Sequence, residues 1–231
     1  MESLSLVNRV AEVRERIDVA LHRSGRADAA RIVAVTKTYP AALVRDARDA
    51  GLPDVGENRV AEMQGKVEEV GRDAVRWHLI GHLQRNKARR AIPLFDLLHS
   101  LDSVRLARQL SDDATSLETE VRALVQVNTS GEESKFGFDP GHAIDAIGEM
   151  AEMPGLRLVG LMTMAPYTAD EAVLRRTFRG ASRLREEAAR QVPGFQAVEL
   201  SMGMSNDFEI AVEEGSTLVR LGTVLFGERE L

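Results

Sequence analysis

Cysteine is absent from this 231-residue sequence. A chain without thiols forms no disulfide bonds, offers no thiolate metal ligands and has no cysteine nucleophile. Long apolar runs are missing as well, because no stretch approaches the roughly 20 residues that cross a bilayer. Charged and polar side chains interrupt the first 21 residues, which argues against a signal peptide. The sequence therefore predicts a cytoplasmic protein without a membrane segment.

Basic clusters of the kind that bind nucleic acids are also lacking. The chain carries 30 basic and 36 acidic residues, which gives a formal net charge of −6, and it has no basic tail. A nucleic-acid function is therefore disfavoured. Linkers rich in Pro, Gly or Ser and internal repeats are absent too, so we expect a single domain over residues 1–231.

Lysine is scarce, and its scarcity draws attention to Lys37. Only four lysines occur among the 30 basic residues, and Lys37 directly follows the apolar run Ile32–Thr36. Arginine supplies the positive charge elsewhere, so a lysine at the end of a buried strand indicates a site that requires a primary amine. An amine can lose its proton on burial and form a Schiff base with an aldehyde, which a guanidinium cannot do. The alternative for this residue alone is a strand-end lysine that reaches the solvent.

Short β-rich runs alternate with longer stretches of helical periodicity. Eight such units in this length predict an α/β protein, a (β/α)8 TIM barrel with an extra N-terminal helix. An open doubly wound sheet is the alternative, but no glycine-rich GxGxxG turn follows the first strand. The expected strands are Ile32–Lys37, Leu52–Asn58, Arg76–Gly81, Leu97–Asp102, Ala123–Asn128, Leu158–Met164, Ala197–Gly203 and Leu218–Gly227. The expected helices span residues 4–23, 40–50, 57–71, 84–91, 103–116, 140–152, 168–191 and 205–214.

Polar residues and glycines end the seventh expected strand and lie within the eighth, and barrels of this kind commonly bind phosphate near the ends of these strands. Ser201 offers a hydroxyl group, and Gly203 and the Gly222–Thr223 pair allow backbone amides to approach an anion. Arg220 lies on the same strand as Gly222. A lysine amine across the barrel mouth from a phosphate site suggests a phosphorylated aldehyde, of which pyridoxal 5′-phosphate (PLP) is the obvious candidate. Taken singly, each of these residues could instead serve as a helix cap or a turn residue.

Six blocks of sequence carry a family resemblance. They are Val35–Thr38, Gly56–Asn58, Trp77–Gln84 with Asn86–Lys87, Gly160–Met164, Ser201–Asp207, and Val219–Thr223 with Phe226–Gly227. In this order the blocks resemble the pyridoxal-phosphate homeostasis protein family, single-domain relatives of the alanine racemase N-terminal barrel. The family pattern leads us to expect a serine at Thr36 and a tyrosine at Arg59, and neither difference removes an assigned role.

The resemblance implies a cofactor and seven residues that bind it. Lys37 would hold PLP as a Schiff base, and Arg220 would face the pyridine nitrogen. The other implied contacts are phosphate binding by Ser201, Gly222 and Thr223, and pocket lining by Asn58 and Met202.

The resemblance also implies a function in intracellular PLP homeostasis. Such a protein would buffer, protect or deliver the cofactor, with effects on amino-acid balance, and no catalytic residue is assigned. PLP-dependent apo-enzymes are candidate partners. Because alanine racemase forms its dimer with the help of a domain that we do not expect here, a monomer is favoured over an obligate dimer.

Two enzyme hypotheses stay open beside the carrier. A fold-type III PLP racemase needs acid/base groups on both faces of its substrate, and in alanine racemase one of them is a tyrosine from the partner subunit's second domain. This chain offers only two tyrosines, Tyr39 and Tyr167. A barrel aldolase that uses Lys37 without a cofactor explains the amine but leaves Arg220 without a role.

The histidines and one basic cluster receive weaker interpretations. His78 and His82 are four residues apart but lack the glutamate of an HExxH motif, so a zinc site is not expected. We expect the remaining histidines to be ordinary surface or packing residues: His22, His99 and His142. A basic cluster near residue 87 is either a solvated helix face or a site for an anionic partner, and its members are Arg85, Lys87, Arg89 and Arg90.

Overall fold

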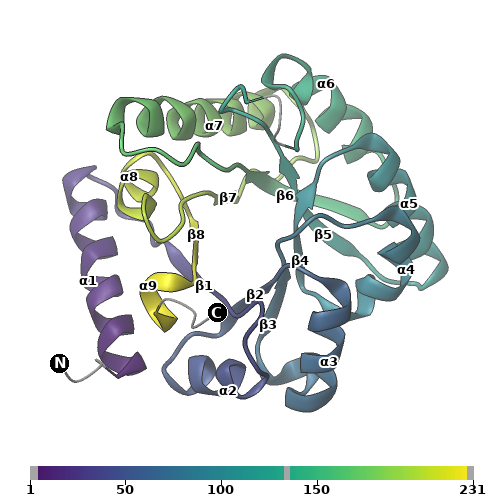
Figure 1. The fold of residues 1–231 in the computed structure, drawn as a ribbon. Coiled ribbons are helices and arrows are strands. Elements are labelled where there is room, and N and C mark those ends of the chain that lie inside the picture. The colour runs from purple at the N-terminus through teal and green to yellow at the C-terminus, as the bar shows by residue number, and fades with distance from the viewer. Residues whose placement is uncertain (1–4, 133–135, 228–231) are drawn as a thin grey trace.

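The structure, a computed structural model, describes residues 5–132 and 136–227 of the chain. Eight parallel strands form a closed barrel in which β8 pairs with β1 (Figure 1). The strands are β1 (Arg31–Val35), β2 (Asp54–Glu57), β3 (Arg76–Leu79), β4 (Leu97–Leu101), β5 (Val121–Gln126), β6 (Leu156–Met162), β7 (Glu199–Ser201) and β8 (Leu218–Leu221). The predicted α/β TIM barrel is confirmed.

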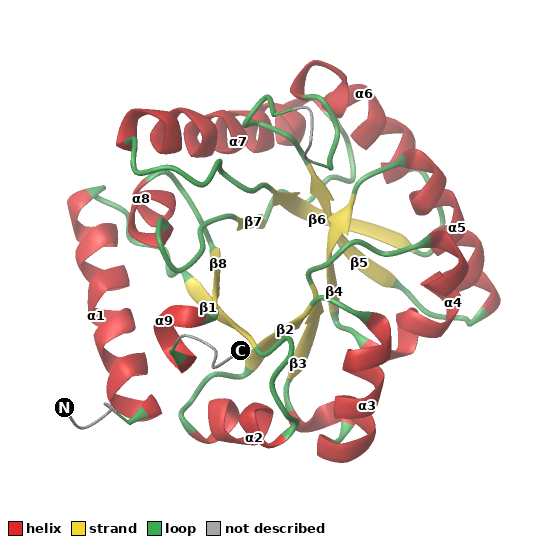
Figure 2. Ribbon diagram, viewed as in Figure 1, coloured by secondary structure: helices red, strands yellow, loops and turns green. Residues whose placement is uncertain are grey.

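Helices surround the ring of strands (Figure 2). Several begin where a side-chain oxygen accepts from a first-turn N–H group, as Ser5 and Asp170 do for α1 and α7. The α-helices are α1 (Leu6–Arg23), α2 (Ala42–Asp49), α3 (Val60–Val70), α4 (Ala88–Ala91), α5 (Val104–Ser116), α6 (Pro140–Ala151), α7 (Glu171–Gln191), α8 (Phe208–Glu213) and α9 (Thr223–Phe226). Short 3-10 turns are η1 (Arg72–Ala74), η2 (Arg85–Lys87) and η3 (Ile92–Leu94). None of the helices in the described residues is long and apolar enough to cross a membrane.

Apolar side chains fill both the inside and the outside of the barrel. Five strands each contribute to one buried cluster in the interior: Val33, Leu97, Leu124, Val159 and Leu218. On the outside, α1 packs against α8 and α9, and its Val10 and Ile17 share a cluster with Phe208 and Leu225. The N-terminal helix is therefore part of the barrel wall beside β8 and β1.

The last expected strand, Leu218–Gly227, is too long. β8 ends at Leu221, and the next residues form α9. Gly222, with φ −121° and ψ −77°, leaves the extended conformation and ends the strand. Leu225 is then fully buried in the cluster of α1 and α8. A short apolar run does not distinguish a strand from a helix by periodicity, and this is why the expectation was wrong.

The carboxyl ends of the strands meet at one edge of the barrel, which we call the carboxyl rim. Lys37 and Asn58, expected at strand ends, lie just beyond β1 and β2. Ser201 is the last residue of β7, and Gly222 follows β8 directly. Barrel closure therefore brings residues from both ends of the sequence to the same rim.

Candidate cofactor site

Lys37 lies in a tight turn two residues beyond β1. Thr36 N donates to Gly56 O at 3.1 Å, so the pairing with β2 continues past the end of β1. Tyr39 N donates to Thr36 O at 3.1 Å and closes the turn. The Lys37 side chain is half-buried. Its backbone is thus fixed by strand pairing at the carboxyl rim.

Two side chains of α3 brace this turn on both sides of Lys37. Lys66 Nζ donates to Thr36 O at 2.7 Å, and the Thr38 N–H group donates to the Glu62 carboxylate. Thr38 has a φ of 66°, a left-handed conformation that costs about 1–2 kcal/mol for a residue with a Cβ. The hydrogen bond from Thr38 helps to hold the turn in this conformation.

Glu57, the last residue of β2, is fully buried beneath the same turn. Its Oε1 accepts hydrogen bonds from Thr36 Oγ1 and from Lys66 Nζ. In the described part of the chain its Oε2 has no hydrogen-bond partner. Burial raises the pKa of Glu57, although the hydrogen bonds from Lys66 and Thr36 oppose this effect. No local pattern in the sequence predicts this buried charge cluster behind Lys37.

Arg220 of β8 places a guanidinium in the barrel interior, where it is only 5% exposed. It donates to Ser201 Oγ at 2.6 Å and to Thr163 O at 3.0 Å, and both acceptors are uncharged. No carboxylate of the described residues forms an ion pair with it. Burial lowers the pKa of Arg220 to about 10, with a weaker opposing effect of Asp207, so the group stays cationic at neutral pH. A buried cation whose hydrogen-bond acceptors are uncharged favours a ligand that supplies an acceptor or a negative charge.

The loops after β7 and β8 are joined directly. Arg220 N donates to Gly203 O at 3.0 Å, and Val224 N donates to Ser205 Oγ at 3.3 Å. Gly203 has a φ of 92°, and a Cβ atom there would lie 2.6 Å from the Cβ of Ala211, so only glycine fits. The two segments expected to bind phosphate are therefore neighbours at the carboxyl rim.

The chain is similar to known proteins over nearly all of its length. The family described as alanine racemase, N-terminal domain, matches residues 9–230. A pyridoxal phosphate homeostasis protein from Aquifex aeolicus is 38% identical over 228 residues, 98% of this chain and 100% of that protein. The protein of the same name from Pseudomonas aeruginosa is 40% identical and covers 98% of this chain and 96% of its own length. The chain belongs to the pyridoxal phosphate homeostasis protein family.

Solved structures agree with this membership. PipY from Synechococcus elongatus PCC7942, with PLP bound, has a TM-score of 0.84 at 34% identity over 96% of this chain and 100% of PipY. Alanine racemase from Clostridium difficile has a TM-score of 0.73 at 15% identity, over 94% of this chain and 57% of the racemase. The racemase likeness concerns the fold alone.

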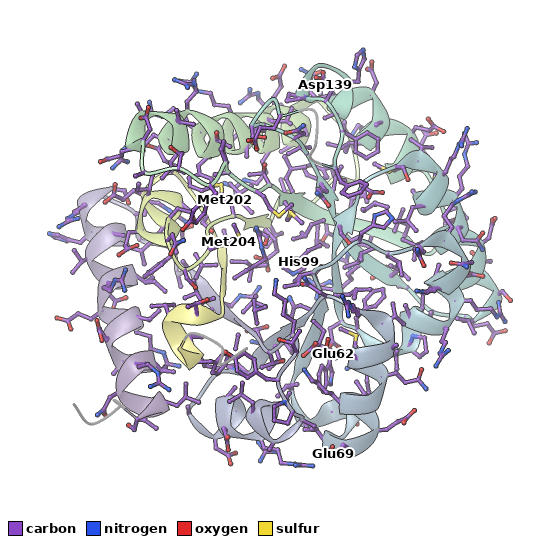
Figure 3. All side chains as sticks on the ribbon, viewed as in Figure 1. Glu62, Glu69, His99, Asp139, Met202 and Met204 are labelled. Atoms are coloured by element: carbon purple, nitrogen blue, oxygen red, sulfur yellow. The ribbon has the colours of Figure 1, made fainter. Side chains whose placement is uncertain are left out.

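In this member of the pyridoxal phosphate homeostasis protein family, the residues expected in the site differ in their exposure to solvent. Thr223 is exposed and Asn58, Gly222 and Lys37 are half-buried. Met202 is fully buried in the same hydrophobic cluster as Ala211 of α8, although a side chain that lines an open pocket would be partly exposed (Figure 3). Its role as a pocket residue stays a prediction.

Ser201 and His99 take part in a contact that the sequence analysis did not identify. Ser201 is fully buried, and besides Arg220 its Oγ contacts His99 Nδ1 at 2.9 Å. The expected phosphate contact of Ser201 also stays a prediction. His99 of β4 is fully buried inside the ring of strands (Figure 3). His22 and His142 are surface residues, as expected. The one available signal for His99 was a histidine within a strand that otherwise holds three leucines and one serine.

The basic cluster lies on η2 and α4, and all four of its residues are exposed. Arg89 donates to Ser116 Oγ at 3.0 Å, and Arg90 donates to Gln64 Oε1 at 2.7 Å. These contacts suit a solvated face, and an anionic partner for the cluster stays a prediction.

Proposed function

We propose that this protein binds PLP and acts in intracellular PLP homeostasis, where it buffers, protects or delivers the cofactor. The observation that carries the proposal is the buried Arg220 guanidinium, which has only uncharged partners in the described residues, at the rim that presents Lys37. The relatives named pyridoxal phosphate homeostasis protein support it, as does PipY with PLP bound.

The residues at the rim match the chemical groups of PLP. The cofactor supplies an aldehyde, which Lys37 would bind as a Schiff base. Arg220 would donate a hydrogen bond to the pyridine nitrogen, and its positive charge would disfavour a proton on that nitrogen. The remaining contacts would be phosphate binding by Ser201, Gly222 and Thr223, and pocket lining by Asn58 and Met202.

The positions of the tyrosines favour a carrier over a racemase. Tyr167 is 93% exposed. The Tyr39 hydroxyl donates to Gly227 O at 3.3 Å, and its ring packs on Phe226. Neither tyrosine offers a buried acid/base group of the kind that racemisation requires.

The proposal also includes a cytoplasmic location, a monomeric state, a single domain over residues 1–231 and delivery of PLP to PLP-dependent apo-enzymes.

Borohydride reduction tests the proposal. The protein mixed with PLP should show the absorption of a Schiff base, and reduction followed by mass mapping should find one PLP on Lys37. Lys37→Ala should keep the fold and lose the adduct, whereas Lys87→Ala, at an exposed lysine, should retain it.

Two outcomes would contradict the proposal. Stoichiometric labelling of Lys66, Lys87 or Lys135 would show that the assigned lysine is wrong; Lys135 lies outside the described residues. A colourless protein that forms no adduct with PLP would favour the aldolase hypothesis.

A further inference from the structure

A continuous chain of hydrogen bonds crosses the barrel interior from Arg220. Ser201 Oγ lies 2.6 Å from Arg220 Nη1 and 2.9 Å from His99 Nδ1. The chain continues from His99 Nε2 to His78 Nδ1 at 2.8 Å and from His78 Nε2 to Asp54 Oδ1 at 2.9 Å. These five residues come from five different strands, and none is more than 5% exposed. We call Ser201, His99, His78 and Asp54 the relay.

The far end of the relay is a fixed negative charge. Asp54 is the first residue of β2 and lines a hollow of about 280 Å³ together with Arg31 and Arg76. Arg76 donates to both Asp54 oxygens, at 2.7 and 2.6 Å. Burial alone would raise the pKa of Asp54, but hydrogen bonds from Arg76 and His78 outweigh it and hold that pKa well below its usual value. Asp54 is therefore ionised and can only accept hydrogen bonds.

The direction of the hydrogen bond at the Arg220 end of the relay is fixed as well. An arginine side chain can only donate, so the Ser201 oxygen accepts from Arg220. Burial holds the pKa of His99 well below its usual value, and the nearby positive charge of Arg220 adds to this effect, so the His99 ring is neutral. A neutral imidazole has one N–H group and one acceptor nitrogen.

Among the arrangements in which each imidazole carries a single proton, one satisfies every contact. The ionised Asp54 requires the His78 proton on Nε2, which leaves His78 Nδ1 as an acceptor for His99 Nε2–H. His99 Nδ1 must then accept the Ser201 hydroxyl proton. All donors in the relay point away from Arg220 and towards Asp54. The one hydroxyl proton of Ser201 is then used by His99, so Gly222 and Thr223 would bind the phosphate and Ser201 would act through Arg220.

We propose that His78 and His99 are positioning residues for Arg220. His99, oriented by His78, accepts a hydrogen bond from the Ser201 hydroxyl. The Ser201 oxygen is thereby kept turned towards Arg220 as an acceptor, and this fixes the guanidinium in the rim site. An alternative arrangement, in which His99 Nδ1–H donates to Ser201, would require a second proton on His78. It would also require a new acceptor for the Ser201 hydroxyl. The link from Arg220 to a bound ligand rests on the proposed function, whereas the proton arrangement does not.

Nitrogen NMR of the histidines tests the arrangement directly. The chain has five histidines, so selective ¹⁵N-histidine labelling gives an assignable spectrum, with His78→Gln and His99→Gln variants for assignment. In the protein without PLP, His78 and His99 should both carry a proton on Nε2 and none on Nδ1. A proton on Nδ1 of either ring would overturn the proposal, whether or not the protein binds PLP.

A double-mutant cycle tests the positioning role. His99→Leu should weaken PLP affinity by about ten-fold or more, because it would disturb the hydrogen bond between the charged Arg220 and Ser201. His99→Asn, which keeps an acceptor for Ser201, should recover most of that loss, and the surface control His142→Leu should change nothing. In a Ser201→Ala background His99→Leu should add less than about two-fold, because both act through the same oxygen.

Independent losses would contradict the relay. If His99→Leu costs as much in the Ser201→Ala background as in the parent, or if His99→Asn recovers nothing, His99 has only a packing role. Failure of the parent protein to bind PLP would instead refute the proposed function and leave the NMR result standing.

Discussion

Lys37 and Lys66 lie at the same rim, but their surroundings give them different chemistry. Lys66 is 5% exposed, and its Nζ donates to Thr36 O, Glu57 and Glu62 at 2.7, 2.7 and 3.0 Å. An ammonium group has three N–H donors, so all of them are used. Lys66 is therefore an ion-pair partner that holds the turn of Lys37.

Replacing Lys66 should destabilise the fold. Lys66→Met keeps the length of the side chain but leaves Glu57 buried without its cation. Breaking a buried ion pair by removing one partner costs about 3–5 kcal/mol. Urea unfolding at neutral pH measures the loss, and Lys87→Met, at an exposed position, should stay within about 0.5 kcal/mol of the parent. Equal stability of the two variants would show that the Glu57 pair is unimportant.

The cost of Lys66→Met should depend on pH. Burial raises the pKa of Glu57 in the folded chain, so this group favours folding below its unfolded pKa, and the benefit is lost as pH rises through the folded pKa. Removing Lys66 removes a hydrogen bond and a charge that lower this pKa. The difference in unfolding free energy between parent and variant should therefore shrink as pH falls from neutral towards acidic. A difference that stays constant with pH would show that Lys66 does not change the pKa of Glu57 in the folded chain.

Thr223 offers a test of the proposed phosphate contact. A hydrogen bond to a charged group contributes about 1.5–3 kcal/mol, so Thr223→Val should weaken PLP binding by roughly ten- to a hundred-fold. The side chain is exposed, so the fold should not change. Pyridoxal, which lacks the phosphate, should bind parent and variant equally in the same titration. Equal losses for the two ligands would place the phosphate elsewhere.

At the scale of elements, the loop between β2 and α3 packs closely on Gly81, the second residue after β3. A Cβ atom at Gly81 would lie 2.2 Å from the carbonyl oxygen of Asn58. Ser100 Oγ donates to Gly81 O at 2.6 Å and holds this segment from the side of β4. The position of Asn58 at the rim therefore depends on a glycine in the neighbouring unit.

Gly81→Ala should shift the Asn58 loop. Overpacking of this kind typically costs about 1–3 kcal/mol, and PLP affinity should fall with it. The matched control is Gly65→Ala in α3, where a Cβ atom meets nothing within 4 Å. Because alanine favours helices, that control should stabilise by about 0.5–1 kcal/mol. Thermal unfolding and PLP titration of both variants measure the contrast, and a shared direction of change would contradict the packing argument.

At the scale of the whole molecule, the barrel combines the Lys37 amine with the Arg220 guanidinium. Among the described residues it offers no buried tyrosine that could serve in racemisation. In the proposed site, the positive charge of Arg220 would lie beside the pyridine nitrogen and would weaken PLP as an electron sink. We therefore expect the pure protein with PLP to show no conversion of L- to D-alanine approaching the median enzyme rate of about 10 s⁻¹. A chiral assay of the product measures this, and rapid conversion that Lys37→Ala abolishes would establish a racemase instead.

The sequence by itself determined the order of the elements and the rim segments, because both are written in local patterns. Alternation of β-rich and helical runs predicted all eight strands, and a lysine after an apolar strand pointed to Lys37 before any geometry was known. Strand ends were less certain, as the residues after Leu221 illustrate: Gly222 ends β8, and burial of Leu225 against α1 selects a helix.

Tertiary structure decided what surrounds each side chain. Barrel closure brings β4 and β7 across the interior from each other, and only then can His99 meet Ser201 and connect Asp54 to Arg220. The register of β7 turns Ser201 inward and Met202 outward, a choice that a shift of one residue would reverse. The contacts of the relay join residues up to 102 positions apart, as between His99 and Ser201, and no local sequence pattern records them.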